Sequence, residues 1–156
     1  MSWEPGRERV RGLIDAGEVE QVTPDLAIAR RMLDDAGRHL ATASRAQMAG
    51  DMSGAYQLAY DALRKSAASL LEAQGLRATT RGGHLAVQEV VTAQFVTTVR
   101  TFRSFGRIRR ARNSFEYPSS NSPGPTSDDI DDAIAVATQA HEAATTILDQ
   151  NVLTRW

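Results

Sequence analysis

Six arginines fall between positions 100 and 112, and their side chains are the ones in this sequence best suited to chemistry. They are Arg100, Arg103, Arg107, Arg109, Arg110 and Arg112. No acidic residue interrupts them, so the segment repels itself unless an anion or an acidic surface lies against it. A guanidinium group pairs with phosphate oxygens through two parallel hydrogen bonds. The segment therefore predicts a surface for an anionic ligand, with Arg103, Arg107, Arg109 and Arg110 as the expected phosphate-binding residues.

The end of this segment also suggests a catalytic set. Cleavage of RNA without metal needs a base, an acid and a cation that stabilises the charge on phosphorus. Arg112 supplies the cation, Glu116 shares its helix face four residues on, and Asn113 and Tyr117 share another. Arg112 favours the ionised, weakly basic form of Glu116, and the Tyr117 phenol is a poor base at neutral pH. The expected catalytic residues are thus Arg112, Asn113, Glu116 and Tyr117, with weak cleavage or none.

Structural interpretations of the same residues stay open. The arginines could pair with the acids at positions 128, 129, 131 and 132, and Arg112 with Glu116 could form an intrahelical ion pair of about 0.3 to 0.5 kcal/mol. His84 is expected to start a helix with its side chain bonded to loop carbonyls, and His141 to be packed. Tyr56 and Tyr60 are expected to fill the core or a dimer seam.

Composition narrows the class of protein. The 156 residues carry a net charge of −1, with 42% hydrophobic and 24% charged residues, which is typical of one globular domain. There is no cysteine, which excludes disulfides and thiolate metal sites, and the three histidines lack metal-ligand spacing. We expect a cytoplasmic protein without metal, cofactor or membrane span.

Apolar spacing predicts helices throughout. Residues 1–22 are expected to be an N-terminal extension with a short helix, and residues 23–152 a helical bundle. The first long helix should begin at Thr23-Pro24-Asp25 and end near Gly50.

The next helix should be capped by Asp51 or Ser53 and stop at Gly75. A further helix is expected from His84 through Phe102, with a bend at 104–106 and a continuation to Tyr117. A loop over 119–125 and a last helix from Thr126 or Ser127 complete the prediction. No strand is expected, so the fold class is all-α, an antiparallel bundle of four to five helices.

Two segments carry a resemblance to a known family. Residues 55–77 are rich in small residues and tyrosine and end in Leu70-Leu71-Glu72-Ala73-Gln74-Gly75-Leu76-Arg77, followed by a loop that ends in Gly83-His84. Residues 109–117 contain an Arg112-Asn113 pair. In both respects the chain, over roughly residues 25 to 150, resembles HEPN domains, and its alanine- and arginine-rich composition resembles that of an actinobacterial HEPN subfamily.

The resemblance implies a homodimer in which two arginine–histidine motifs face each other and cleave RNA without metal. It also implies a nucleotide-binding or toxin–antitoxin context, with an antitoxin or nucleotidyltransferase as possible partner. Glu116 and Tyr117 stand where the family carries its catalytic histidine. We therefore expect a protein that binds RNA or nucleotide through an arginine-rich cleft, with altered or absent ribonuclease activity. The alternative is an inactive interaction scaffold whose arginines dock an acidic protein.

Overall fold

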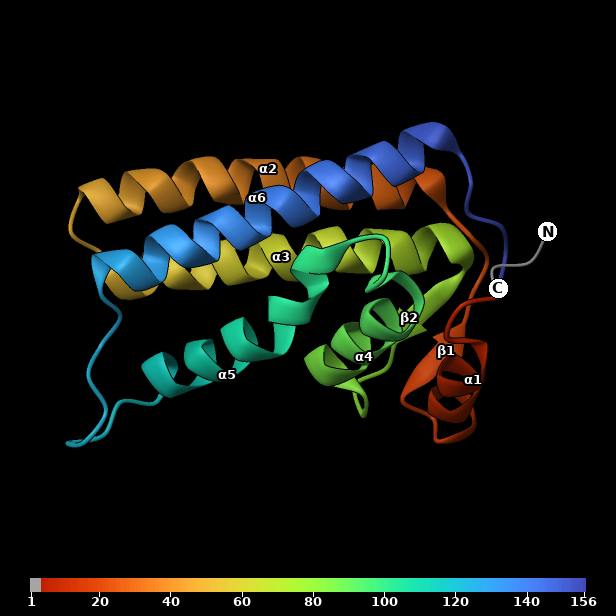
Figure 1. The fold of residues 1–156 in the computed structure, drawn as a ribbon, viewed down its shortest axis with the longest axis horizontal. Coiled ribbons are helices and arrows are strands. Elements are labelled where there is room, and N and C mark those ends of the chain that lie inside the picture. Colours follow the sequence, from red (N-terminus) through yellow and green to blue (C-terminus); the bar gives the residue numbers. More distant parts are fainter. Residues whose placement is uncertain (1–3) are drawn as a thin grey trace.

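Three long helices form the larger part of the molecule. The computed structural model describes residues 4–156, and its long helices are α2 (Leu26–Met48), α3 (Met52–Gln74) and α6 (Ser127–Gln150). Figure 1 shows α2 and α3 as an antiparallel pair, with α6 beside them and running in the same direction as α3. The predicted long helices are thus confirmed.

Local capping explains where these helices begin and end. Asp25 caps α2, because its Oδ1 accepts the Ile28 N–H at 3.0 Å, so the helix starts at Leu26 and not at the expected Pro24. Asp51 caps α3 in the same way. Thr126 and Asp129 form a reciprocal capping box at α6. Gly75 ends α3 in the left-handed conformation, with a φ of 77°.

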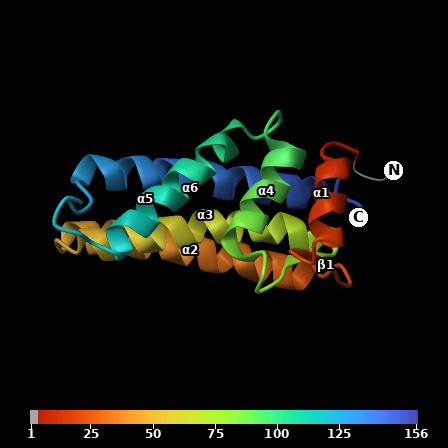
Figure 2. The same ribbon diagram turned by 90° about the horizontal axis from the view of Figure 1, so that it is seen from below.

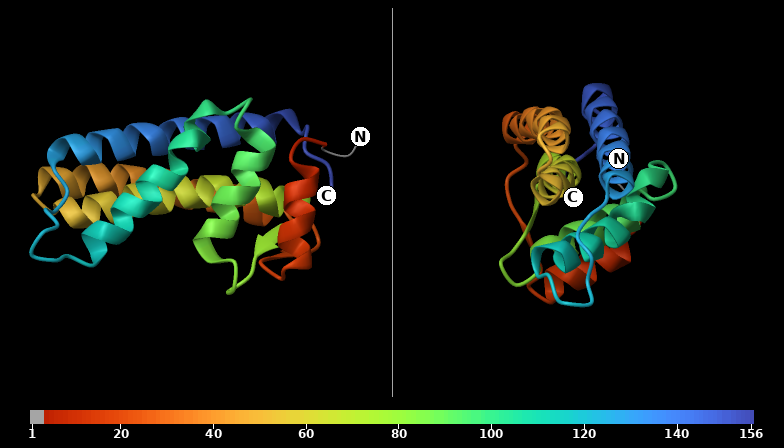
Figure 3. Two further views of the ribbon diagram at one scale, coloured as in Figure 1. Left: turned by 60° about the horizontal axis from the view of Figure 1, so that its bottom comes forward. Right: turned by 90° about the vertical axis from the view of Figure 1, so that its left-hand side faces the viewer.

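A second layer lies across α3. It consists of α4 (Gly83–Phe95), the 3₁₀ helix η1 (Arg100–Ser104) and α5 (Phe105–Glu116). Figure 2 shows α4 and α5 over α3, and Figure 3 shows α5 crossing α3 obliquely. These elements position the arginine-rich segment against the middle of α3.

The prediction of a continuous helix from His84 through Phe102 was wrong. It breaks after Phe95, and Val99 adopts an extended backbone with φ −118° and ψ 86°. Residues 96–99 are all β-branched, and such side chains lose rotamer freedom in a helix. The described chain has six α-helices, namely the N-terminal helix α1 and five helices in the bundle, α2 to α6, so the number of bundle helices agrees with the predicted four to five.

The prediction that no strand occurs was also wrong. β1 (Val19–Gln21) and β2 (Leu76–Ala78) form an antiparallel pair in which Glu20 faces Arg77. The short N-terminal helix α1 (Arg7–Asp15) was predicted, and its Val10 and Leu13 are buried. The N-terminal residues thus close one end of the bundle.

The core surrounds α3, as the breadth of its apolar face predicted. Tyr60, Leu63 and Leu70 of α3 are fully buried with Phe95, Phe102 and Phe105 of the second layer. The all-helical class fits this architecture, apart from the two short strands. Within residues 4–156, no helix is both long enough and apolar enough to cross a membrane.

Candidate functional site

The arginines of η1 and α5 divide by the face on which they lie. Phe105 and Ile108 bury the inner side of α5. Arg103, Arg107 and Arg110 are exposed, whereas Arg109 and Arg112 are half-buried at the edge of the contact with α3. The structure thus brings only two of the predicted phosphate-binding or catalytic arginines toward a shared inner surface.

Arg107 is taken up by a structural ion pair. Its two terminal nitrogens lie 2.6 and 3.3 Å from the carboxylate oxygens of Asp132 on α6. These hydrogen bonds raise the pKa of Arg107. The alternative that an arginine of this segment pairs with the acids of the last helix is therefore confirmed for Arg107.

Arg112 is held by neutral and acidic partners together. Its Nε donates to Oε1 of Gln57 on α3 at 2.8 Å, and its Nη1 lies 2.5 Å from Oε2 of Glu116. Its guanidinium carbon lies 5.6 Å from the centre of the Tyr60 ring. The predicted intrahelical pair with Glu116 is confirmed, and it coexists with a contact to the middle of α3.

Arg109 has a different environment. Its Nε donates to Oε1 of Gln88 on α4 at 2.9 Å. Among residues 4–156, no carboxylate lies within 4 Å of its guanidinium group. A half-buried arginine that is oriented by a neutral amide keeps its positive charge available for an anion.

A tyrosine and a histidine lie near these arginines. Tyr60 Oη is 3.0 Å from Nδ1 of His84, in the first turn of α4. Burial raises the pKa of Tyr60 to about 12, so its hydroxyl stays protonated. This is its one hydrogen bond to the part of the chain that the structure describes, and Tyr60 is only 2% exposed. We infer that Tyr60 donates to Nδ1 and that the proton of neutral His84 sits on Nε2.

Three guanidinium groups act on His84. Burial is the main cause that lowers its pKa, followed by the positive charges of Arg64, Arg112 and Arg109, while Asp61 opposes them. His84 is therefore neutral at pH 7. We call Arg64, Arg109 and Arg112, with Tyr60 and His84, the basic cluster.

His84 lies at the start of α4, as expected, but its ring bonds to the Tyr60 hydroxyl and not to the expected loop carbonyls. His141 lies elsewhere, between α6 and α2, with Nε2 2.9 Å from the carbonyl oxygen of Leu33. It is packed, as predicted. Tyr56 is buried, as predicted, against Phe115 at a ring distance of 4.9 Å.

The other predicted site residues lie outside the cluster. Tyr117 is 75% exposed just beyond α5, and Arg103 and Arg110 are exposed. Asn113 is exposed and accepts a hydrogen bond from Arg112 at 3.1 Å. Glu116 reaches the cluster only through its ion pair with Arg112.

Sequence reasoning missed Arg64, Gln57 and Gln88, and assigned Tyr60 mainly to packing, with base stacking as the minor alternative. Their spacing carried a signal, since residues 57, 60, 61 and 64 share one face of a helix and His84 lies four residues before Gln88. Nothing in the sequence showed that these two faces meet.

The cluster is not part of the hollows beside α1, of about 810 Å³, and between α2 and α6, of about 210 Å³. In the residues described, no group of three histidine, aspartate or glutamate side chains could hold a metal ion. Comparison with protein-family models, curated proteins and solved structures gives no match for this chain.

Proposed function

We propose that this protein is a HEPN-type helical domain that binds RNA by holding a backbone phosphate at the basic cluster. The observation that carries the proposal is Arg109, a half-buried arginine held by Gln88 with no carboxylate at its guanidinium group among the described residues. Burying a charge without a counter-charge costs free energy. A bound anion would recover that cost.

The charge of the cluster favours a phosphodiester over a nucleotide triphosphate. Asp61 pairs with Arg64 and Glu116 pairs with Arg112, so two of the three guanidinium charges are neutralised. One positive charge remains, at Arg109, and His84 is neutral at pH 7. A single backbone phosphate carries one negative charge, which matches this balance.

The tautomer of His84 favours binding over cleavage. With Nδ1 accepting from Tyr60, the ring offers an N–H at Nε2, which can donate to a phosphate oxygen but cannot remove a proton from a 2′-hydroxyl. Glu116 is already engaged in its ion pair with Arg112. We therefore expect the protein to retain RNA without cleaving it.

The test is binding of a fluorescein-labelled 20-nucleotide single-stranded RNA in EDTA at several salt concentrations. Arg109→Ala and Arg112→Ala should each weaken binding about tenfold to a hundredfold, since a charge-assisted hydrogen bond contributes about 1.5 to 3 kcal/mol. Arg31→Ala removes the same charge from an exposed position on α2 and is the matched control. Equal losses in all three variants would contradict the proposal.

Two further arms separate the alternatives. Gel analysis of the RNA after incubation detects cleavage, and products that disappear with His84→Ala would make the protein a ribonuclease with His84 in the catalytic role. ATP as competitor measures nucleotide binding. Poly-glutamate that binds as tightly as RNA, with the same arginine dependence, would instead favour the scaffold that docks an acidic protein.

A further inference from the structure

Arg64 reaches the basic cluster from α3, and one carboxylate controls its position. We infer that Asp61 is a positioning residue that holds Arg64 in the cluster and ties it to α2, an inference that rests on the proposed function. Asp61 lies one turn before Arg64, and its Oδ1 accepts hydrogen bonds from Nε at 3.1 Å and from Nη2.

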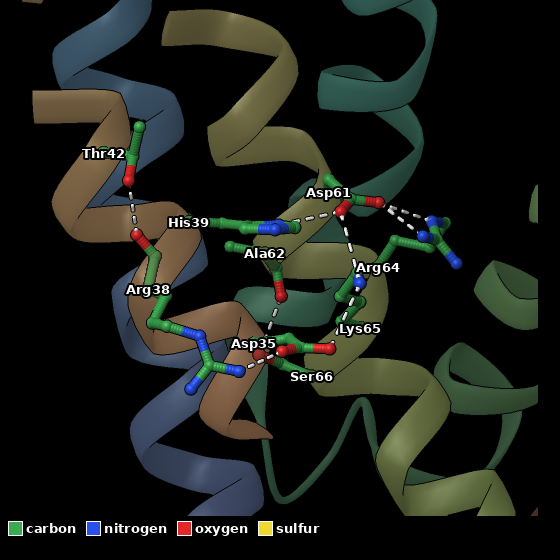
Figure 4. Close-up of polar contacts among 9 residues, drawn as sticks. All are labelled: Asp35, Arg38, His39, Thr42, Asp61, Ala62, Arg64, Lys65 and Ser66. Carbon is green, nitrogen blue, oxygen red and sulfur yellow. Dashed lines mark hydrogen bonds and ion pairs between the residues drawn. The ribbon is translucent and has the colours of Figure 1, made fainter. Parts of the chain in front are cut away.

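The two oxygens of Asp61 face different groups. While Oδ1 binds Arg64, Oδ2 lies 2.8 Å from Nδ1 of His39 on α2 and 3.8 Å from Nζ of Lys65. The His39 ring is close but not aligned for a hydrogen bond. Figure 4 shows Asp61 between His39 on one side and Arg64 on the other. Turning the carboxylate away from Arg64 would disturb both sets of contacts.

The α2 side of the network is itself fixed. Lys65 lies 3.6 Å from Oδ2 of Asp35, and Asp35 also pairs with Arg38 (Figure 4). The hydrogen bond from Arg38 is the largest of the causes that lower the pKa of Asp35. The side chains of Asp61, His39 and Lys65 are each 24 to 30% exposed, so water screens their charges less than at an open surface.

Among the arginines of the basic cluster, Arg64 has the largest electrostatic effect on Tyr60 and His84. Its positive charge is the largest charge effect on both His84 and Tyr60. Among residues 4–156, Asp61 is the only carboxylate within 4 Å of Arg64. Without Asp61, nothing else described would anchor this guanidinium group beside His84.

Two roles for Asp61, holding Arg64 in position or only adding a negative charge, predict opposite changes in phosphate affinity and in the pKa of His84 for Asp61→Asn. If Asp61 merely adds a negative charge near the cluster, its removal strengthens phosphate binding and lowers the pKa of His84. If Asp61 holds Arg64, its removal lets Arg64 leave. Phosphate binding then weakens, and the pKa of His84 rises toward its usual 6.5.

The first measurement is an NMR titration of the His84 ring in the wild type, Asp61→Asn and Arg64→Gln. Arg64→Gln calibrates the rise caused by loss of the charge. A similar rise in Asp61→Asn supports positioning, whereas a fall overturns it. Should Asp61→Asn not fold, Asp61→Glu is titrated instead, because its longer arm displaces Arg64 while keeping the charge. An unchanged His84 pKa in that variant would overturn the inference.

The second measurement is affinity for the labelled RNA. We expect Asp61→Asn to weaken binding about threefold to tenfold, and to have no further effect in the Arg64→Gln background. Tighter binding, or an additive loss in the double variant, would overturn the inference. The inference about Asp61 and the proposed function can fail separately. If the pKa of His84 rises in Asp61→Asn but RNA binding is insensitive to Arg109→Ala, Asp61 still positions Arg64, and the proposed function is wrong.

Discussion

Two regions of α3 differ in how the polar side chains find hydrogen-bond and ion-pair partners: its C-terminal end and its middle. At the end, Glu72 is only 2% exposed as a side chain, and Arg77 of β2 donates to both of its oxygens, at 2.8 and 3.3 Å. The buried amides of Gln74 and Gln94 donate to each other, at 2.7 and 3.1 Å. Each of these four side chains has a partner within the chain.

In the middle of α3, the pairing is incomplete. Arg109 is oriented by Gln88 but has no counter-charge among the described residues, and His84 bonds through one ring nitrogen. Both regions use arginine, glutamine and a buried helix face. Polar groups paired within the protein stabilise the fold, whereas the half-buried guanidinium group of Arg109, which has no counter-charge among the described residues, is the basis of the proposed phosphate site.

The largest effect should follow loss of Arg77. Arg77→Ala leaves the buried Glu72 carboxylate without its cation, and we expect a loss of about 3 kcal/mol in the free energy of unfolding. Urea denaturation measures it. Arg109→Ala is the matched change in the cluster and should cost less than about 1 kcal/mol. Equal costs would remove the contrast between the two regions.

The glutamine pair should show strong coupling. Gln94→Met leaves the Gln74 amide buried without a partner and should cost about 2 kcal/mol. The double variant Gln74→Met, Gln94→Met removes both polar groups at similar volume and should recover most of that loss. Thermal or urea unfolding of the wild type, Gln74→Met, Gln94→Met and the double variant gives the coupling free energy. Additive losses would show that the pair is not a closed unit.

Tyr60→Phe should have a smaller effect on stability. It removes one hydrogen bond, to a histidine that is partly accessible to water, and should cost about 1 kcal/mol. The nitrogen chemical shifts of the His84 ring, measured by NMR, should change as well. In this variant Nδ1 of His84 loses its hydrogen-bond donor, and the ring is free to change tautomer. A nitrogen chemical shift of His84 Nδ1 that is unchanged from the wild type would contradict the assignment of Tyr60 as the donor.

The smallest effect should be a pH dependence from His84. Its pKa is lower in the folded chain than the usual 6.5, so the unfolded chain takes up this proton first as pH falls. Stability present above pH 6.5 is therefore lost as pH falls from 6.5 through the folded-state pKa. His84→Asn should remove this slope when unfolding is followed between pH 7.5 and 5. An unchanged slope would mean that another group causes it.

Much of the fold followed from local sequence. The aspartate before α2, Asp51 and the Thr126 box marked helix starts, and Gly75 marked a stop, because caps act within three or four residues. Apolar periodicity gave the buried faces of α2, α3 and α6. The break at 96–99 was harder, since its β-branched residues also kept helical spacing with Phe95 and Phe102.

Only part of the candidate site could be predicted from the sequence. The amino-acid pattern is enough to show that arginines gather in one segment and that Arg112 and Glu116 share a helix face. The packing of the helices pairs Arg107 with Asp132, gives Arg109 a neutral partner and brings His84 to Tyr60, which lies 24 residues away in the sequence. The two kinds of information differ in the distance along the chain over which the interactions act. Caps and helical periodicity are set by residues within one turn, whereas the environment of a charge is set by the helices that pack around it.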